Sequence, residues 1–140
     1  MRTMPDLDFA LLANAAQVGG DRLISLLGGG WDTAAVPQEA YPVGMVLNVV
    51  FRLRFDDEEV GKTHAGEIAV EGEDGERIAV VTFSLDVQRA QELPPGWKTS
   101  VPVVAPVPVQ FPGPGLYALL IAVGGAVLKT IALRMKVAGA

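Results

Sequence analysis

Every second residue from Val43 to Phe55 is apolar, and this alternation constrains the fold more than any other stretch. Successive side chains of a β-strand point to opposite faces, so the seven odd-numbered residues share one face. Asn48, Arg52 and Arg54 fall on the other face. The segment is therefore predicted to be a long strand with one face in a hydrophobic core.

The same alternation returns further along the chain. Gly66 to Glu71 is expected to form a short strand, and Asp74-Gly75 is a pair preferred in tight hairpin turns. The returning strand is predicted to bury five residues, which are Ala79, Val81, Phe83, Leu85 and Val87. In the crossover loop that follows, we expect Trp97 to cover one end of the core.

The segment Val101 to Phe111 carries three prolines, at positions 102, 106 and 108. The backbone N–H groups of a strand point alternately to its two edges. The N–H groups that these three prolines lack would therefore all lie along one edge. The segment is therefore predicted to be an edge strand whose hydrogen bonds all go to the opposite side.

Two further hairpins are expected, one at each end of the chain. Residues 116–123 and 127–137 would pair across Gly124-Gly125, and residues 116–122 are apolar on both faces. Such a strand is either covered on both sides or part of an exposed apolar patch. At the N-terminal end, residues 7–13 fit a helix capped by Asp6 or a strand burying Leu7, Phe9, Leu11 and Ala13. We favour the strand, which Gly19-Gly20-Asp21 would turn into residues 22–27.

These segments together predict an all-β protein. The expected architecture is a single antiparallel β-sandwich domain over residues 1–140, with about eight or nine strands and an Ig-like or related topology. A β-barrel is the alternative closure. The sequence contains no cysteine, which excludes disulfides, thiolate nucleophiles and cysteine-containing zinc sites.

The charge distribution argues against nucleic-acid binding. The formal net charge is −5, the acidic residues concentrate between Asp56 and Glu76, and only four cations follow Glu92. The apolar run from Leu116 to Leu128 is shorter than a membrane-spanning helix and is interrupted by glycines. With no convincing secretory signal, we expect a cytoplasmic protein without a transmembrane segment.

The N-terminal third carries two motifs, Asp8-Phe9-Ala10-Leu11-Leu12-Ala13 and Gly28-Gly29-Gly30-Trp31-Asp32. Together with the closing Pro112-Gly113-Pro114-Gly115 hairpin, they resemble an uncharacterised family of small, mostly actinobacterial β-domain proteins. The resemblance implies a β-domain fold and transfers no functional residues.

His64 is the only histidine, so a nucleophile–base pair would have to join it to Ser25, Ser84 or Ser100. No serine lies in a nucleophile-elbow motif. We expect His64 to be solvated in its acidic loop, and we expect neither enzymatic activity nor a cofactor.

Two acidic runs are weak candidates for a Ca²⁺ site, with Asp56, Asp57, Glu59 and Asp74 as the possible ligands. Calcium needs six to eight oxygen ligands, often from loop carboxylates. The runs would have to converge at one end of the sandwich, and EF-hand spacing is absent. Solvated acidic loops are the simpler interpretation.

The run Gly28-Gly29-Gly30-Trp31-Asp32 does not match a phosphate-binding loop, because neither Gly-Lys-Ser/Thr nor a helix follows it. Glycines within a β segment mark a bulge or a corner. We interpret this run as a structural signature in which Trp31 anchors the core and Asp32 hydrogen-bonds backbone at the bend.

Two functions fit the sequence. The first is a non-enzymatic structural or protein-interaction module, which could self-associate, since the chain is half hydrophobic and lacks a catalytic motif. The second is a small-ligand module that binds a glycan or Ca²⁺ through its end loops. Trp31, Tyr41 and Trp97 would supply its stacking platform.

Overall fold

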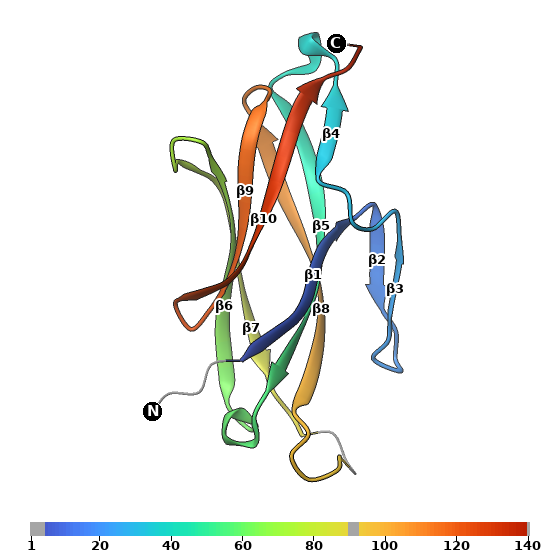
Figure 1. The fold of residues 1–140 in the computed structure, drawn as a ribbon, viewed down its shortest axis with the longest axis vertical. Coiled ribbons are helices and arrows are strands. Elements are labelled where there is room, and N and C mark those ends of the chain that lie inside the picture. The colour runs from blue at the N-terminus through green and yellow to red at the C-terminus, as the bar shows by residue number, and fades with distance from the viewer. Residues whose placement is uncertain (1–4, 90–92, 140) are drawn as a thin grey trace.

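The computed structural model describes residues 5–89 and 93–139, and nearly all of them lie in β-strands or turns (Figure 1). Within these ranges, no helix has the length and apolar character needed to cross a membrane. The two helical elements are short 3-10 turns, η1 (Gln38–Ala40) and η2 (Asp57–Glu59). The ten strands are β1 (Asp6–Ala13), β2 (Ala15–Val18), β3 (Ile24–Leu27), β4 (Thr33–Val36), β5 (Val43–Phe55), β6 (Thr63–Gly72), β7 (Arg77–Asp86), β8 (Thr99–Phe111), β9 (Gly115–Val123) and β10 (Ala126–Val137).

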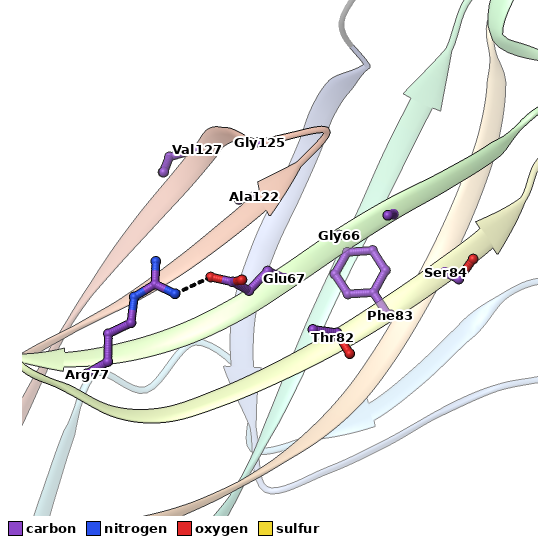
Figure 2. A pocket seen from close by; sticks show the side chains of 10 residues that line it. Gly66, Glu67, Arg77, Thr82, Phe83, Ser84, Ala122, Gly125 and Val127 are labelled. Carbon is purple, nitrogen blue, oxygen red and sulfur yellow. Dashed lines mark hydrogen bonds and ion pairs between the residues drawn. The ribbon is translucent and has the colours of Figure 1, made fainter.

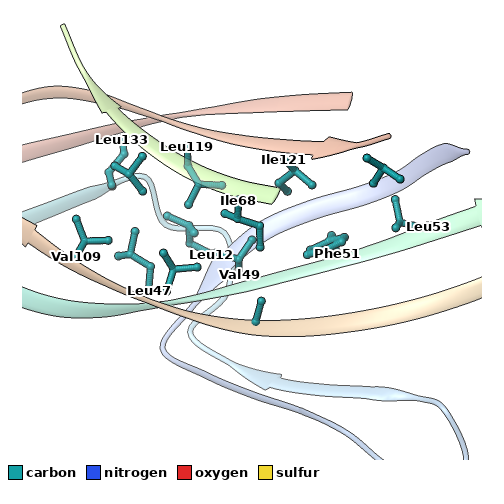
Figure 3. Packing of buried hydrophobic residues seen from close by; sticks show 14 of the residues in the cluster. Leu12, Leu47, Val49, Phe51, Leu53, Ile68, Val109, Leu119, Ile121 and Leu133 are labelled. Atoms are coloured by element: carbon teal, nitrogen blue, oxygen red, sulfur yellow. The ribbon is translucent and has the colours of Figure 1, made fainter. Parts of the chain in front are cut away.

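Two sheets pack face to face, which confirms the predicted β-sandwich. One sheet has the order β1-β5-β8 and the other β4-β10-β9-β6-β7, while β2 and β3 form a separate two-stranded ribbon. The inward side chains of both sheets interdigitate in one hydrophobic cluster, shown in Figure 3. The ten strands exceed the expected eight or nine because the structure adds two short strands: β2, which pairs with β3, and β4, which pairs in parallel with β10.

Strand β5 organises this core as its sequence predicts. Leu47, Val49, Phe51, Leu53 and Phe55 are fully buried on its inner face. β5 pairs with β1 on one side and along its whole length with β8 on the other.

Strand β8 is an edge strand, as its three prolines predict. Among the described residues its ladder runs to β5 alone, from Thr99 opposite Phe55 to Phe111 opposite Val43. The edge of β8 that lacks the three proline N–H groups therefore faces away from β5.

Strand β1 differs from the prediction in which residues it buries. The register shifts between Leu7 and Phe9, so a β-bulge at Asp8 reverses the facing of every later residue. Ala10 and Leu12 consequently face the core, whereas Phe9 is 36% exposed. Ala13 is also buried, at 1% exposure, although it lies on the opposite face from Leu12; the predicted burial therefore holds at Leu7 and Ala13 and fails at Phe9.

The β2–β3 ribbon forms a partial third layer outside the β1-β5-β8 sheet (Figure 1). β2 packs over β5 and β8, where the outward Val50 is fully buried. At the ribbon tip, Arg22 donates a hydrogen bond to the Ser100 carbonyl at 2.7 Å. The ribbon is thus attached to the sandwich along β2 and at its tip.

Two expectations about the outer surface have different outcomes. The outer face of β9 is partly exposed, with Leu116 at 56% and Leu120 half-buried. Of the two alternatives for this strand, which is apolar on both faces, the structure shows the exposed apolar patch. Trp97 does not cover the core, because 62% of it is exposed. The prediction for Trp97 is therefore wrong.

Candidate functional site

The Gly28-Gly29-Gly30 run is a corner that takes the chain from β3 past the end of β1 and into β4. Gly28 and Gly30 have φ angles of 61° and 91°, which L residues rarely adopt. A Cβ on Gly28 would lie 2.3 Å from the Asn14 amide nitrogen. Gly30 N–H donates to the Leu12 carbonyl at 2.7 Å, which fixes the corner against β1.

Trp31 leaves this corner and packs against the hydrophobic cluster while remaining partly exposed. Its indole Nε1 is buried and has no hydrogen-bond partner. The Asp32 side chain accepts a bond from the Thr33 hydroxyl at 3.1 Å, and the Asp32 carbonyl accepts from Arg134 N–H at 2.8 Å. The bond from Asp32 to the backbone is therefore made by its carbonyl and not by its carboxylate.

A depression of about 490 Å³ lies beside the corner, lined by Asn14, Gly28, Gly29, Gly30, Trp31, Thr33, Ala34 and Met45. No charged side chain lines it. The depression therefore presents only neutral groups.

His64 is half-buried rather than solvated, which corrects the sequence expectation. Its ring lies 4.7 Å from the Phe55 ring, and its Nε2 lies 2.9 Å from the Glu59 carbonyl oxygen. Alternation along β6 and β7 places His64 on the inner face and Ser84 on the outer face. Ser100 holds Arg52 on the other sheet and Ser25 lies in the ribbon, so no serine is brought to His64.

The two acidic runs do not converge. η2 precedes β6 and the Glu73–Glu76 turn follows it, so ten strand residues, or about 30 Å, separate them (Figure 1). Each candidate ligand instead has a local partner: Asp56 with Lys98, Asp57 with Arg89, Glu59 with His64, and Asp74 with the Glu76 N–H. The described residues contain no group of three or more His, Cys, Asp or Glu placed to hold a metal ion.

The aromatic platform is not assembled either. Tyr41 precedes β5 and Trp97 precedes β8, and these antiparallel strands pair over thirteen residues, so about 40 Å separates the two rings. Trp31 lies near Met45, toward the Tyr41 end. The Tyr41 hydroxyl is engaged, because it donates to the Lys136 carbonyl at 3.0 Å and burial raises its pKa.

An open groove of about 770 Å³ lies on the outer face of the five-stranded sheet (Figure 2). β6, β7 and the β9–β10 hairpin form its walls. Across it Arg77 pairs with Glu67 at 2.5 Å and with Glu71 at 3.5 Å. Thr82 and Ser84 add two hydroxyls. The arginine already has two carboxylate partners, so the groove offers hydroxyls and aliphatic walls rather than a free charge.

The sequence analysis does not identify an exposed apolar surface that lies on the β2–β3 ribbon. We call residues 15–27 the apolar ribbon; its exposed large side chains are Val18 (39%), Leu23 (66%), Leu26 (38%) and Leu27 (73%). A shallow hollow of about 250 Å³ in it is lined only by Ala15, Ala16, Gln17, Ser25, Leu26 and Leu27. The signal was present in the sequence, because Asp21 and Arg22 are the only charged residues between Phe9 and Trp31.

One ion-pair cluster has shifted pKa values. The hydrogen bond from Lys98 lowers the pKa of the Asp6 carboxyl, and the same bond raises the pKa of the Lys98 ammonium. Asp56 lies 3.6 Å from the same ammonium. The cluster joins the start of β1 to the segment before β8, so its role is structural.

Comparison with solved structures finds similarity to small parts of much larger enzymes. A β-glucuronidase from glycoside hydrolase family 2 superposes with a TM-score of 0.46 and 11% identity, over 69% of this chain and 10% of that one. A glycosyl hydrolase family 2 member from Bacteroides cellulosilyticus DSM 14838 gives a TM-score of 0.45 and 12% identity, over 74% and 14% of the two chains. This chain thus spans a small part of either enzyme, and we draw no functional conclusion from the likeness.

A search of curated proteins finds no match. A model of a family of unknown function, DUF6941, matches residues 8–136. The match covers both N-terminal motifs and the closing hairpin, and it confirms the expected membership of a family without an assigned activity. The chain belongs to DUF6941.

Proposed function

We propose that this chain is a non-enzymatic protein-interaction module that binds a different protein through its apolar ribbon. The observation that carries the proposal is the exposure of Leu23 and Leu27, at 66% and 73%, on a ribbon whose only charged residues are Asp21 and Arg22. Removing a leucine side chain from water contributes about 1.5–3 kcal/mol, so a partner covering both gains a useful share of a binding free energy.

The form of the ribbon supports the same function. An isolated two-stranded hairpin is marginally stable in water, and a further strand or packed surface stabilises it. The face carrying Ile24 packs toward the sandwich, while the face carrying Leu27 is open. Interface cores are depleted of charged residues, so the proposed partner presents an apolar, uncharged surface to the ribbon.

The separation of the candidate catalytic groups supports a non-enzymatic role, since His64 and the serines occupy different faces or sheets. The small-ligand alternative has less support. Asp56 and Asp74 lie at opposite ends of β6, and Tyr41 and Trp97 lie at opposite ends of the β5–β8 ladder.

The experiment is co-purification from native cells with three versions of the chain. The wild type is compared with Leu27→Glu and with Leu116→Glu, a matched control 56% exposed on the other sheet. Both variants should keep the wild-type thermal midpoint, because neither side chain is in the core. The proposal expects a stoichiometric partner with the wild type and with Leu116→Glu, and its loss with Leu27→Glu. Equal recovery with all three chains, or no partner with any, would refute it.

A further inference from the structure

Strand β7 has a long unpaired edge. It is the outermost strand of its sheet, and within the described residues its ladder runs to β6 alone. From Ile78 to Leu85 it contains no charged residue and no proline. A strand of this kind leaves a row of backbone N–H and C=O groups available to another strand.

The other sandwich edges carry features that oppose strand addition. β8 has three prolines, β1 has the bulge at Asp8, and β4 is only four residues long. β7 is ten residues long, and its one register shift lies at its start, opposite Glu71. The contrast marks β7 as the edge left open for pairing.

We propose that β7 pairs antiparallel with β7 of a second copy, joining the two five-stranded sheets into one continuous sheet across a two-fold axis. The inference concerns a different surface from the apolar ribbon and does not depend on the function proposed for it. Directly opposed residues in an antiparallel pair point to the same face. The inward residues of one copy therefore lie opposite inward residues of the other only if the two-fold axis passes between a residue and the same residue of the second copy.

The register centred on Thr82 fits the charges of the strand. This register sets Val80 opposite Ser84 of the second copy. Because of the register shift at the start of β7, it also sets Arg77 of each copy opposite Asp86 of the other. Arg77 is 51% exposed on the outer face, where it already pairs with Glu67 and Glu71, so Asp86 of the second copy would be a further carboxylate partner. Asp86 lies on the same face and accepts a bond from the Thr63 hydroxyl. Opposite charges at facing positions stabilise a strand pair, whereas like charges destabilise it. This reciprocal arrangement favours a second copy over an unrelated segment.

The register can be tested by disulfide trapping, because the chain has no cysteine of its own. In Thr82→Cys the two thiols meet at the axis, within reach of a disulfide, and oxidised glutathione should yield a covalent dimer about tenfold faster than in Val80→Cys. In Val80→Cys the two thiols are offset by four residues, about 13 Å along the strand. The double variant Val80→Cys/Ser84→Cys should recover fast cross-linking.

A charge exchange tests the same pairing without cysteine. Sedimentation equilibrium should show a dimer for the wild type, a dissociation constant raised about tenfold by Arg77→Asp or by Asp86→Arg, and recovery in the double variant. A wild type that stays monomeric up to millimolar concentration, or equal trapping of Thr82→Cys and Val80→Cys, would overturn the inference. Leu27→Glu should leave the dimer intact. Either test can therefore fail while the other succeeds, because the two concern different surfaces.

Discussion

Gly66 shows how one missing side chain sets the packing between β6 and β7. A Cβ at this position would lie 2.1 Å from Cζ of Phe83, whose ring packs 5.7 Å from the Phe51 ring in the core. Figure 2 shows the Phe83 ring lying over Gly66. The glycine is therefore needed for space rather than for an unusual backbone angle.

Gly66→Ala should lower the free energy of unfolding by about 1–3 kcal/mol, because the ring must leave its packed position. Gly44→Ala in β5 is the matched control, since its Cβ would meet only the Gln110 amide oxygen at 3.4 Å. Urea denaturation measures both. Equal stability changes for the two variants would contradict this role of Gly66.

Trp31 gives a second prediction at this scale. Its ring packs on the core but is partly exposed, so Trp31→Ala should cost about 3 kcal/mol, the low end for a large aromatic. Trp31→Phe should cost less, because it also removes the buried Nε1 that has no partner. Thermal denaturation of the two variants tests this order, and an unchanged midpoint for Trp31→Ala would refute its role as an anchor.

The Asp6–Lys98 pair predicts a specific pH dependence. The pKa of Asp6 is lower in the folded state than in the unfolded state, where it is about 3.9. The ionised Asp6 therefore stabilises the fold above this unfolded-state pKa, and the stabilisation is lost as the pH falls through the folded-state pKa. Asp6 is 56% exposed, so Asp6→Asn should cost less than about 1 kcal/mol at pH 7. Once the pH is below the folded-state value, the two chains should be equally stable in urea denaturation. A difference that does not shrink as the pH falls would contradict the assignment.

At the scale of elements, the strands with regular alternation could be predicted and the irregular ones could not. β5 and β8 follow their apolar periodicity, because each buries one continuous face. The β9–β10 hairpin forms across the predicted glycine turn, although β10 shifts register between Val127 and Lys129. The bulge at Asp8 has no signature in the alternation, so the predicted face of β1 fails beyond Leu7. The parallel pairing of β4 with β10 joins segments about a hundred residues apart, and no local pattern encodes it.

The proline edge of β8 gives a prediction for a whole element. Pro106→Val/Pro108→Val restores two N–H groups on the unpaired side of β8, which removes a barrier to strand addition. The variant should fold and then form larger oligomers than the wild type when warmed below its unfolding midpoint. Light scattering measures this, with Pro95→Val in the preceding loop as control; identical scattering of the two variants would count against the protective role.

At the scale of the molecule, the candidate sites depended on distances that the sequence does not contain. The acidic runs flank β6 in the sequence and are separated in space by its full length. His64 is expected in a solvated loop, but its ring packs on Phe55. Burial of a loop residue depends on which strand ends beside it, and that is decided by sheet order. The ribbon stands out in the sequence as a segment with only two charged residues, Asp21 and Arg22, but its exposure follows from its position outside both sheets.

The central claim is that a partner protein covers the apolar ribbon in the cell. It is tested most directly by replacing Leu27 with a photoreactive phenylalanine analogue and irradiating native cells, with the same replacement at Leu116 as control. We predict one defined adduct with a different protein from position 27 and none from position 116. The absence of an adduct at position 27, or the same adducts at both positions, would contradict the account.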